Sequence, residues 1–201
     1  MRTIVIALAS LIVPVTLLAQ SDAYQIRYAA NLNVGDSFID ITNAGSISGA
    51  DPAGNICANV YAFDATEEPI SCCSCLVTPN GLKSLSIRRD ILSNTLTGGP
   101  LPGTSSVVVK LLATTVPSGG CNAAAPGALA PGMRAWGTSL HASPSGYTLT
   151  ETAFSTAPLS ANERSKLVST CSFINTYASG YGQCRSCRLG GLATPGGVQA
   201  R

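Results

Sequence analysis

The sequence predicts a mainly β protein, with one antiparallel, β-sandwich-like domain that is stapled by disulfides and carries one C-terminal α-helix. Three observations lead to this prediction. Apolar and polar residues alternate with a period of two over several segments, as in half-buried strands. The 201 residues include 20 Gly and 12 Pro, which favour many turns. The chain also has eight cysteines, and one stretch alone combines helical spacing with a helix start signal.

The longest alternating segment covers residues 24–34, and we expect it to form one strand. Shorter segments predict strands over residues 37–42, 56–63, 82–87, 106–115, 133–141 and 147–154. Residues 106–115 are apolar on both faces, which is typical of a central buried strand. Lys110 lies within this segment, so it has to reach an edge or find a partner.

The helix is expected over residues 160–178. Ser160 and Glu163 have the spacing of a capping box, and Gly180 is a suitable stop. Leu167, Cys171 and Ile174 share one face at helical spacing, so Cys171 should point into the core. We expect residues 35–192 to form the disulfide-rich β domain and residues 193–201 to form a flexible tail.

Residues 1–23 have the pattern of a signal peptide. Arg2 precedes an apolar run, and small residues at Ala19 and Ala23 offer two cleavage sites. The alternative is a membrane anchor, but the run is shorter than the roughly 20 residues that span a bilayer. We therefore expect a secreted mature chain, extracellular or at the cell surface, with no membrane segment.

Export changes the expected chemistry of the cysteines. In an oxidising compartment an even number of cysteines favours disulfides, and eight cysteines allow 105 pairings. The spacing alone leaves the pairing open. Neighbouring cysteines at 72 and 73 should take different partners, because a bond between them would close a strained ring. The cysteines are Cys57, Cys72, Cys73, Cys75, Cys121, Cys171, Cys184 and Cys187.

Two other uses of cysteine compete with this interpretation. Cys73, Cys75, Cys184 and Cys187 offer four thiolates, the ligand set of a structural zinc site. Cys184-x-x-Cys187 also has the spacing of a thiol-redox motif, although it follows a helix and a Gly-rich turn. Because export favours disulfides, we expect no metal and no cofactor.

Composition argues against catalysis and nucleic-acid binding. The chain has one histidine, His141, and no G-x-S-x-G motif, so the sequence does not predict an enzyme. The net charge is only +2, and no run of basic residues could follow a phosphate backbone.

The chain resembles a group of uncharacterised, secreted, cysteine-rich bacterial proteins, which implies no reaction. The motifs that carry the resemblance are Cys57-Ala-Asn-Val-Tyr, Cys72-Cys-Ser-Cys, Leu111-Leu-Ala, Arg134-Ala-Trp-Gly-Thr and Cys184-Arg-Ser-Cys-Arg-Leu-Gly-Gly-Leu. The alternation of residues 24–34 is also similar to the donor strand of chaperone-type pilins, in pattern only.

From these features we expect a structural subunit of an extracellular filament or pilus-like surface assembly. Residues 24–34 would be added to the sheet of a neighbouring copy, so the chain's partner would be itself, as a homopolymer. The subunit-interface residues would be Tyr24, Ile26, Tyr28, Ala30, Leu32 and Val34. Three alternatives stay open: a first strand that pairs inside its own domain, a monomeric secreted protein with a ligand near Trp136, and a cysteine-based zinc or thiol-redox protein.

Overall fold

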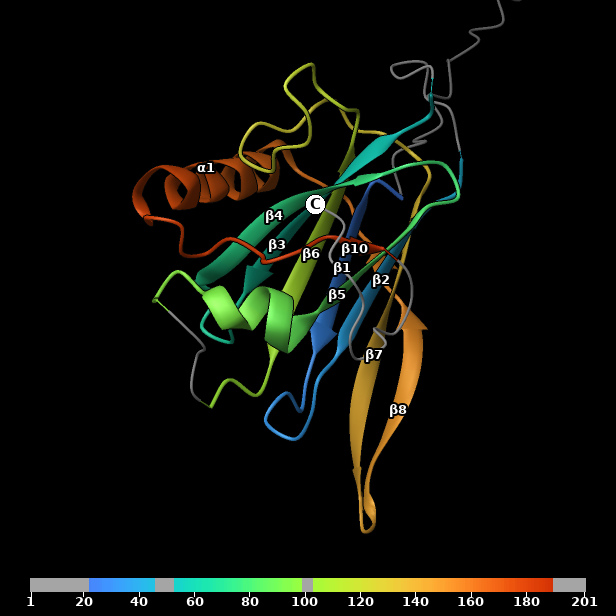
Figure 1. Ribbon diagram of the computed structural model, residues 1–201, viewed down its shortest axis with the longest axis vertical. Helices are drawn as coiled ribbons and strands as arrows, with labels where there is room; N and C mark the ends of the chain where they lie inside the picture. The colour runs from blue at the N-terminus through green and yellow to red at the C-terminus, as the bar shows by residue number, and fades with distance from the viewer. Residues whose placement is uncertain (1–21, 46–52, 99–102, 190–201) are drawn as a thin grey trace, which may run out of the picture.

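The computed structural model describes residues 22–45, 53–98 and 103–189. They form two antiparallel sheets of five strands each, which pack against each other as a sandwich (Figure 1). The strand order is β4-β3-β6-β1-β9 in sheet A and β10-β5-β2-β7-β8 in sheet B. The predicted fold class, mainly β with one C-terminal helix and four disulfides, is confirmed.

The chain crosses repeatedly between the two sheets, and β3–β4 and β7–β8 are hairpins within one sheet. Sheet A contains β1 Tyr24–Ala29, β3 Ile56–Phe63, β4 Pro69–Val77, β6 Val107–Thr114 and β9 Ser155–Thr156. Sheet B contains β2 Phe38–Asn43, β5 Leu82–Ser86, β7 Met133–Ser143, β8 Gly146–Ala153 and β10 Arg188–Leu189. The helical elements are η1 Ile87–Ile91, η2 Leu92–Asn94 and α1 Ala161–Tyr177.

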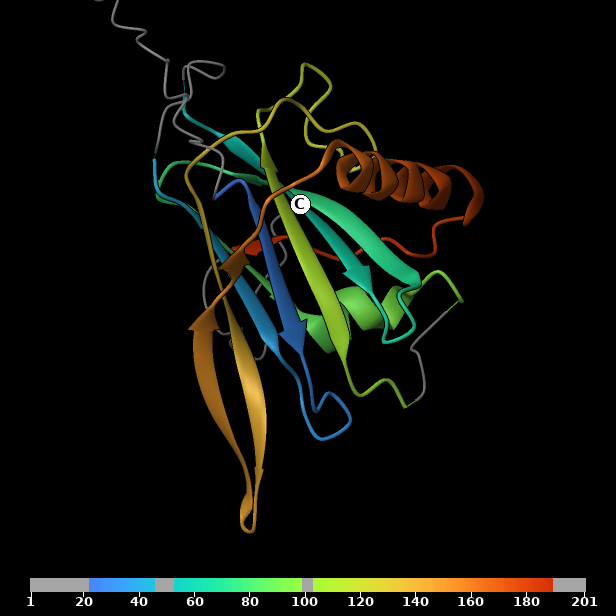
Figure 2. The ribbon, with the colours of Figure 1, turned by 180° about the vertical axis from the view of Figure 1, so that it is seen from behind.

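The core has two layers. Apolar side chains from both sheets fill the space between them, including Ile39, Ile41 and Val60. A second cluster lies between sheet A and α1, where Tyr61 and Leu112 meet side chains of the helix. Figure 2 shows α1 on the side of sheet A that faces away from sheet B. Because sheet A is covered on both faces, its central strands read as nearly continuous apolar runs.

Lys110 lies in the middle of β6 and forms an ion pair with Glu163, so the charged partner expected from the sequence is present. Its Nζ lies 2.6 Å from Oε1 of Glu163 on α1 and 4.8 Å from the ring centroid of Phe63. The tyrosine hydroxyl of Tyr24 also donates to this carboxylate, at 3.4 Å. The helix is therefore joined to sheet A by polar as well as apolar contacts.

The helix begins as predicted. Ser160 is the N-cap, and its Oγ accepts a hydrogen bond from the backbone N–H of Glu163. The Glu163 side chain turns toward Lys110, so the described contacts show one half of the expected capping box. Leu167, Cys171 and Ile174 are the buried residues of α1, which confirms the predicted face.

The expected strand over residues 24–34 is too long. Strand β1 ends at Ala29, and Asn31 has a left-handed backbone with φ 59°. The Val34 N–H bonds to the Asn31 carbonyl, which closes a turn, and Asn31 Nδ2 donates to the Leu140 carbonyl at 2.6 Å. Asparagine tolerates this conformation, so a turn interrupts an alternation that continues in sequence.

Most of the expected signal peptide and the whole expected tail, residues 193–201, lie outside the described residues. Within the described part of the chain, no helix is long and apolar enough to cross a bilayer.

Candidate functional site

All eight cysteines are paired in disulfides. The pairs are Cys57–Cys121, Cys72–Cys171, Cys73–Cys184 and Cys75–Cys187. Cys72 and Cys73 take different partners, as predicted, and Cys171 joins α1 to β4. Three of the bridges fix β4 to later parts of the chain, so this strand is pinned on both faces.

The cysteines of the zinc hypothesis do lie together. The sulfur atoms of Cys73, Cys75 and Cys187 are within 4.8 Å of one another. They are held in two disulfides, however, and a disulfide sulfur is not the thiolate that zinc requires. Cys184 and Cys187 each bond to β4 and not to each other, so the C-x-x-C motif does not form a redox disulfide. In this state the cluster is a structural staple.

The six residues expected at a subunit interface do not share one face. Leu32 is buried in the core between the sheets, and Tyr24 is buried beneath α1. Ile26 and Ala30 are half-buried, whereas Tyr28 and Val34 are exposed. Strand β1 pairs with β6 along its whole length on one side and with β9 at Gln25 and Ile26 on the other. The N-terminal segment is thus an inner strand of its own domain, and its addition to a neighbour's sheet stays a prediction.

The polar face of β1 points inward instead. Arg27 is 8% exposed and Gln25 is 3% exposed. The Arg27 guanidinium donates to the carbonyl and Oγ1 of Thr152, at 2.9 and 2.6 Å, and to Ser139 Oγ at 2.7 Å. Burial lowers the pKa of Arg27, while the charge of Glu151 acts in the opposite direction. Arg27 therefore anchors the β7–β8 hairpin to sheet A.

A pocket of about 210 Å³ opens beside Trp136, where β1, β7 and the crossover from β8 to β9 meet. The indole is 37% exposed, whereas Phe154 is only 6% exposed. The lining residues are Asp22, Gln25, Arg134, Ala135, Trp136, Ala153, Phe154 and Thr156.

The polar side of this pocket consists of the ion pair between Asp22 and Arg134 and the side-chain amide of Gln25. Asp22 Oδ2 accepts from Arg134 at 2.7 Å and from the Gly132 N–H at 3.2 Å. Gln25 Nε2 donates to the carbonyls of Asp22 and Met133, which leaves its Oε1 as an acceptor with no partner among the described residues. Asp22 Oδ1 is buried and likewise has no described hydrogen-bond donor. The pocket thus has an amide oxygen of Gln25 and the charged Asp22–Arg134 pair beside an aromatic surface.

Trp136 was predicted from the sequence as a ligand contact, but the polar residues around it were not. Arg134 stands two positions before Trp136, and residues two apart on a strand share a face, so this one neighbour could have been found. Asp22 had been assigned to the signal peptide. Gln25 lies on the face of β1 opposite to the predicted interface residues.

Three other side chains with acid–base chemistry lie on the exposed surface. His141 is exposed, and its Nε2 lies 2.7 Å from Thr150 Oγ1, with no carboxylate among its described hydrogen-bond partners. Glu67 and Glu68 lie exposed in the β3–β4 turn.

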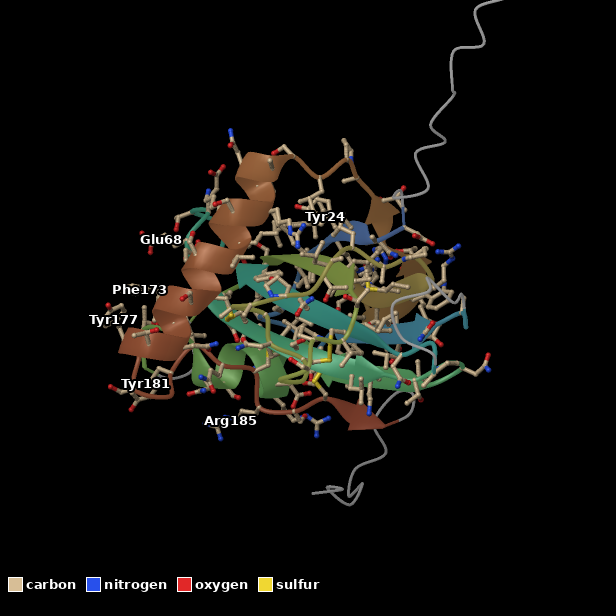
Figure 3. All side chains as sticks on the ribbon, turned by 90° about the horizontal axis from the view of Figure 1, so that it is seen from above. Tyr24, Glu68, Phe173, Tyr177, Tyr181 and Arg185 are labelled. Atoms are coloured by element: carbon tan, nitrogen blue, oxygen red, sulfur yellow. A yellow bond between two sulfur atoms is a disulfide. The ribbon has the colours of Figure 1, made fainter. Side chains whose placement is uncertain are left out.

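Further aromatic side chains lie on the outside of the helix (Figure 3). Phe173 and Tyr177 are exposed, with ring centroids 5.3 Å apart, and Tyr181 follows just after the helix. They lie on the outer surface, away from the pocket beside Trp136.

No protein-family model, no curated protein and no solved structure matches the chain. The resemblances drawn from the sequence therefore stay predictions, and the functional argument rests on the geometry of the chain itself.

Proposed function

We propose that this chain is an exported, non-catalytic binding protein that holds one neutral, hydroxyl-rich ring of a saccharide in the pocket beside Trp136. The observation that carries the proposal is the meeting of an exposed indole with an intact Asp22–Arg134 pair in one pocket. This is the ligand-binding alternative of the sequence analysis, with a ligand class attached.

The chemistry of the walls selects such a ligand. A pyranose ring has an apolar C–H face that packs on an aromatic surface, which Trp136 supplies. Its hydroxyl groups both donate and accept, so they match Gln25 Oε1 and the remaining N–H groups of Arg134. Asp22 and Arg134 carry opposite charges, so the wall has no net charge to attract an ion.

Pocket size supports a single ring. The volume of about 210 Å³ lies below the roughly 300–1,000 Å³ typical of sites for drug-sized ligands. We expect weak binding, with a Kd of about 1 mM for a monosaccharide, which corresponds to about −4 kcal/mol. Several neighbouring rings of a polysaccharide would raise the apparent affinity.

Export is part of the proposal. Four disulfides suit an oxidising compartment, and residues 1–23 have the signal-peptide pattern. Asp22 forms a wall of the pocket, and the carbonyl of the buried Ala23 accepts from the Ala113 N–H at 2.7 Å. Cleavage after Ala19 keeps both residues, whereas cleavage after Ala23 removes them. We therefore place the cleavage site after Ala19.

The test uses the intrinsic fluorescence of Trp136, which is the only tryptophan of the chain. Titration of the mature protein with a panel of neutral monosaccharides and polysaccharides should shift its emission in a saturable way. Asp22→Asn should weaken binding by removing the charge pair while keeping the indole. Phe173→Ala, which removes an exposed aromatic ring on α1, is the matched control and should bind as the parent does.

The result that would overturn the proposal is an unchanged emission across the whole panel, with no chemical-shift changes at the pocket in NMR spectra. Equal weakening by Asp22→Asn and Phe173→Ala would likewise exclude this pocket as the site.

A further inference from the structure

The outer edge of β8 is an open strand edge. All eight residues of β8 are exposed, and β8 is the last strand of sheet B within the described part of the chain. The β7–β8 hairpin extends beyond the rest of the sandwich in Figure 1 and Figure 2.

The other described sheet edges are short or covered. Strands β9 and β10 have two residues each. Strand β4 is bridged by Gln183 at Cys72, where Cys72 N–H donates to Gly182 and the Cys72 carbonyl accepts from Cys184. Strand β8 therefore differs from the other edges in both length and exposure.

The hydrogen bonds to β7 show which backbone groups of β8 point outward. The Phe154 N–H donates to the Ala135 carbonyl at 2.9 Å, and the β7–β8 register continues without a shift. Because antiparallel pairs alternate, Thr148, Thr150 and Thr152 direct their backbone groups toward β7. The N–H and C=O groups of Tyr147, Leu149 and Glu151 then point away from it.

This edge lacks the devices that usually prevent pairing. Strand β8 contains no proline, no lysine and no bulge, and its only charged residue is Glu151. Tyr147 is 49% exposed and Leu149 is 52% exposed, on the same face of the strand. Arg27 holds the hairpin against β1, so the edge is presented in a fixed position.

We propose that β8 pairs antiparallel with β8 of a second copy of this chain, around a two-fold axis through Leu149. In this register Leu149 faces Leu149 of the second copy, and Tyr147 faces Glu151, whose carboxylate can accept the phenol O–H. No like charges face each other. Every outward N–H and C=O of Tyr147, Leu149 and Glu151 finds a partner, and the two copies share one continuous sheet. A shift by two residues would place Glu151 against Leu149 and lose this match.

The second copy is the occupant that fits this edge best. A two-fold interface must be self-complementary, and a nearly uncharged strand with one central leucine meets that condition. The inference does not depend on the ligand proposed for the pocket, because the pairing residues do not line it.

The test measures the mass of the mature protein by sedimentation velocity over a range of concentrations. The parent should show a reversible monomer–dimer equilibrium. Leu149→Lys should weaken the dimer at least about tenfold, since it sets two like charges opposite each other on the axis. Leu149→Pro removes a N–H that points away from β7, so it should abolish both central hydrogen bonds and leave the hairpin intact.

Ser172→Lys adds the same charge on the exposed surface of α1 and should leave the dimer unchanged. Melting curves must show that each variant is folded, and Leu149→Lys decides the test if Leu149→Pro is not. A parent that stays monomeric at every concentration overturns the inference. A dimer or larger assembly that survives Leu149→Lys also overturns it, because its contacts would then lie elsewhere.

Discussion

Gly137 on β7 lies against the buried Arg27, and replacing it with alanine should release the hairpin from sheet A. A Cβ atom at this position would lie 2.3 Å from Nε, 2.5 Å from Cδ and 2.9 Å from Cζ of Arg27. These atoms belong to the fixed part of the side chain, because its guanidinium is bonded to Thr152 and Ser139. The arginine must therefore move, and its hydrogen bonds must lengthen or break.

The magnitude follows from two effects that overlap. Overpacking a core costs about 1–3 kcal/mol, and a hydrogen bond to a charged group contributes about 1.5–3 kcal/mol. Movement of Arg27 relieves the clash and breaks the bonds, so the two costs do not add fully. We expect Gly137→Ala to lower the free energy of unfolding by about 3 kcal/mol, which corresponds to roughly 6–12 °C in Tm for a chain of this size.

The assay is urea unfolding in non-reducing buffer, as a double-mutant cycle with Arg27→Ala. In the Arg27→Ala background the clash is absent, so Gly137→Ala should cost less than about 0.5 kcal/mol. Gly119→Ala is the control, because a Cβ at Gly119 would meet no atom within 4 Å. Equal costs of Gly137→Ala in both backgrounds would refute the role assigned to Arg27.

Two more predictions concern the staple on α1 and the turn between β3 and β4. Replacing both Cys72 and Cys171 with serine removes the bridge between β4 and α1. Because the neighbouring Cys73–Cys184 bridge stays closed, the loop that is released has only about 15 residues, and chain entropy predicts a loss of about 3 kcal/mol; an unchanged urea midpoint would show that this bridge does not restrain the unfolded chain. Burial acts to raise the pKa of Asp64, but hydrogen bonds from Thr66 and Glu68 outweigh it, so the pKa is lowered. A lowered folded-state pKa gives stability that is complete above the unfolded value of about 3.9 and is lost as pH falls through the folded value. The difference in unfolding free energy between the parent and Asp64→Ala should therefore shrink as pH falls from about 5 to 2, and a constant difference would contradict this.

The spacing of apolar residues predicted the strands and the helix well where burial alone determines which positions are apolar. Residues 106–115 are apolar on both faces because β6 lies between β3 and β1, with the second sheet below and α1 above. The helix face of Cys171 followed from its spacing alone. In both cases burial dictates the residue type, so the residue type reports the burial.

The pattern of β1 did not reveal that its polar face is buried, because distant residues satisfy the hydrogen bonds of that face. Arg27 and Gln25 look like a solvent face, but Thr152, Ser139 and the Met133 carbonyl satisfy their hydrogen bonds inside the sandwich. These partners come from residues more than 100 positions away, so no local pattern could reveal them. The pairing of eight cysteines has the same origin, since distant segments meet only in the folded chain. The pocket shares this difficulty, because its residues run from position 22 to position 156.

The position of β1 connects the N-terminal segment to both the pocket beside Trp136 and the β7–β8 hairpin. Donation of residues 24–34 to a neighbour would withdraw Gln25 from the pocket beside Trp136 and remove Arg27 from the hairpin. It would also uncover β6 and expose the Lys110–Glu163 contact beneath α1. A copy that donates this strand therefore needs the same strand of another copy to complete its pocket and to hold its β7–β8 hairpin. Association through β8 would not displace β1, because the outward backbone groups of β8 have no partner among the described residues. Association through β8 would thus keep the pocket and the hairpin anchor within one copy, whereas exchange of the N-terminal strand would build both from two copies.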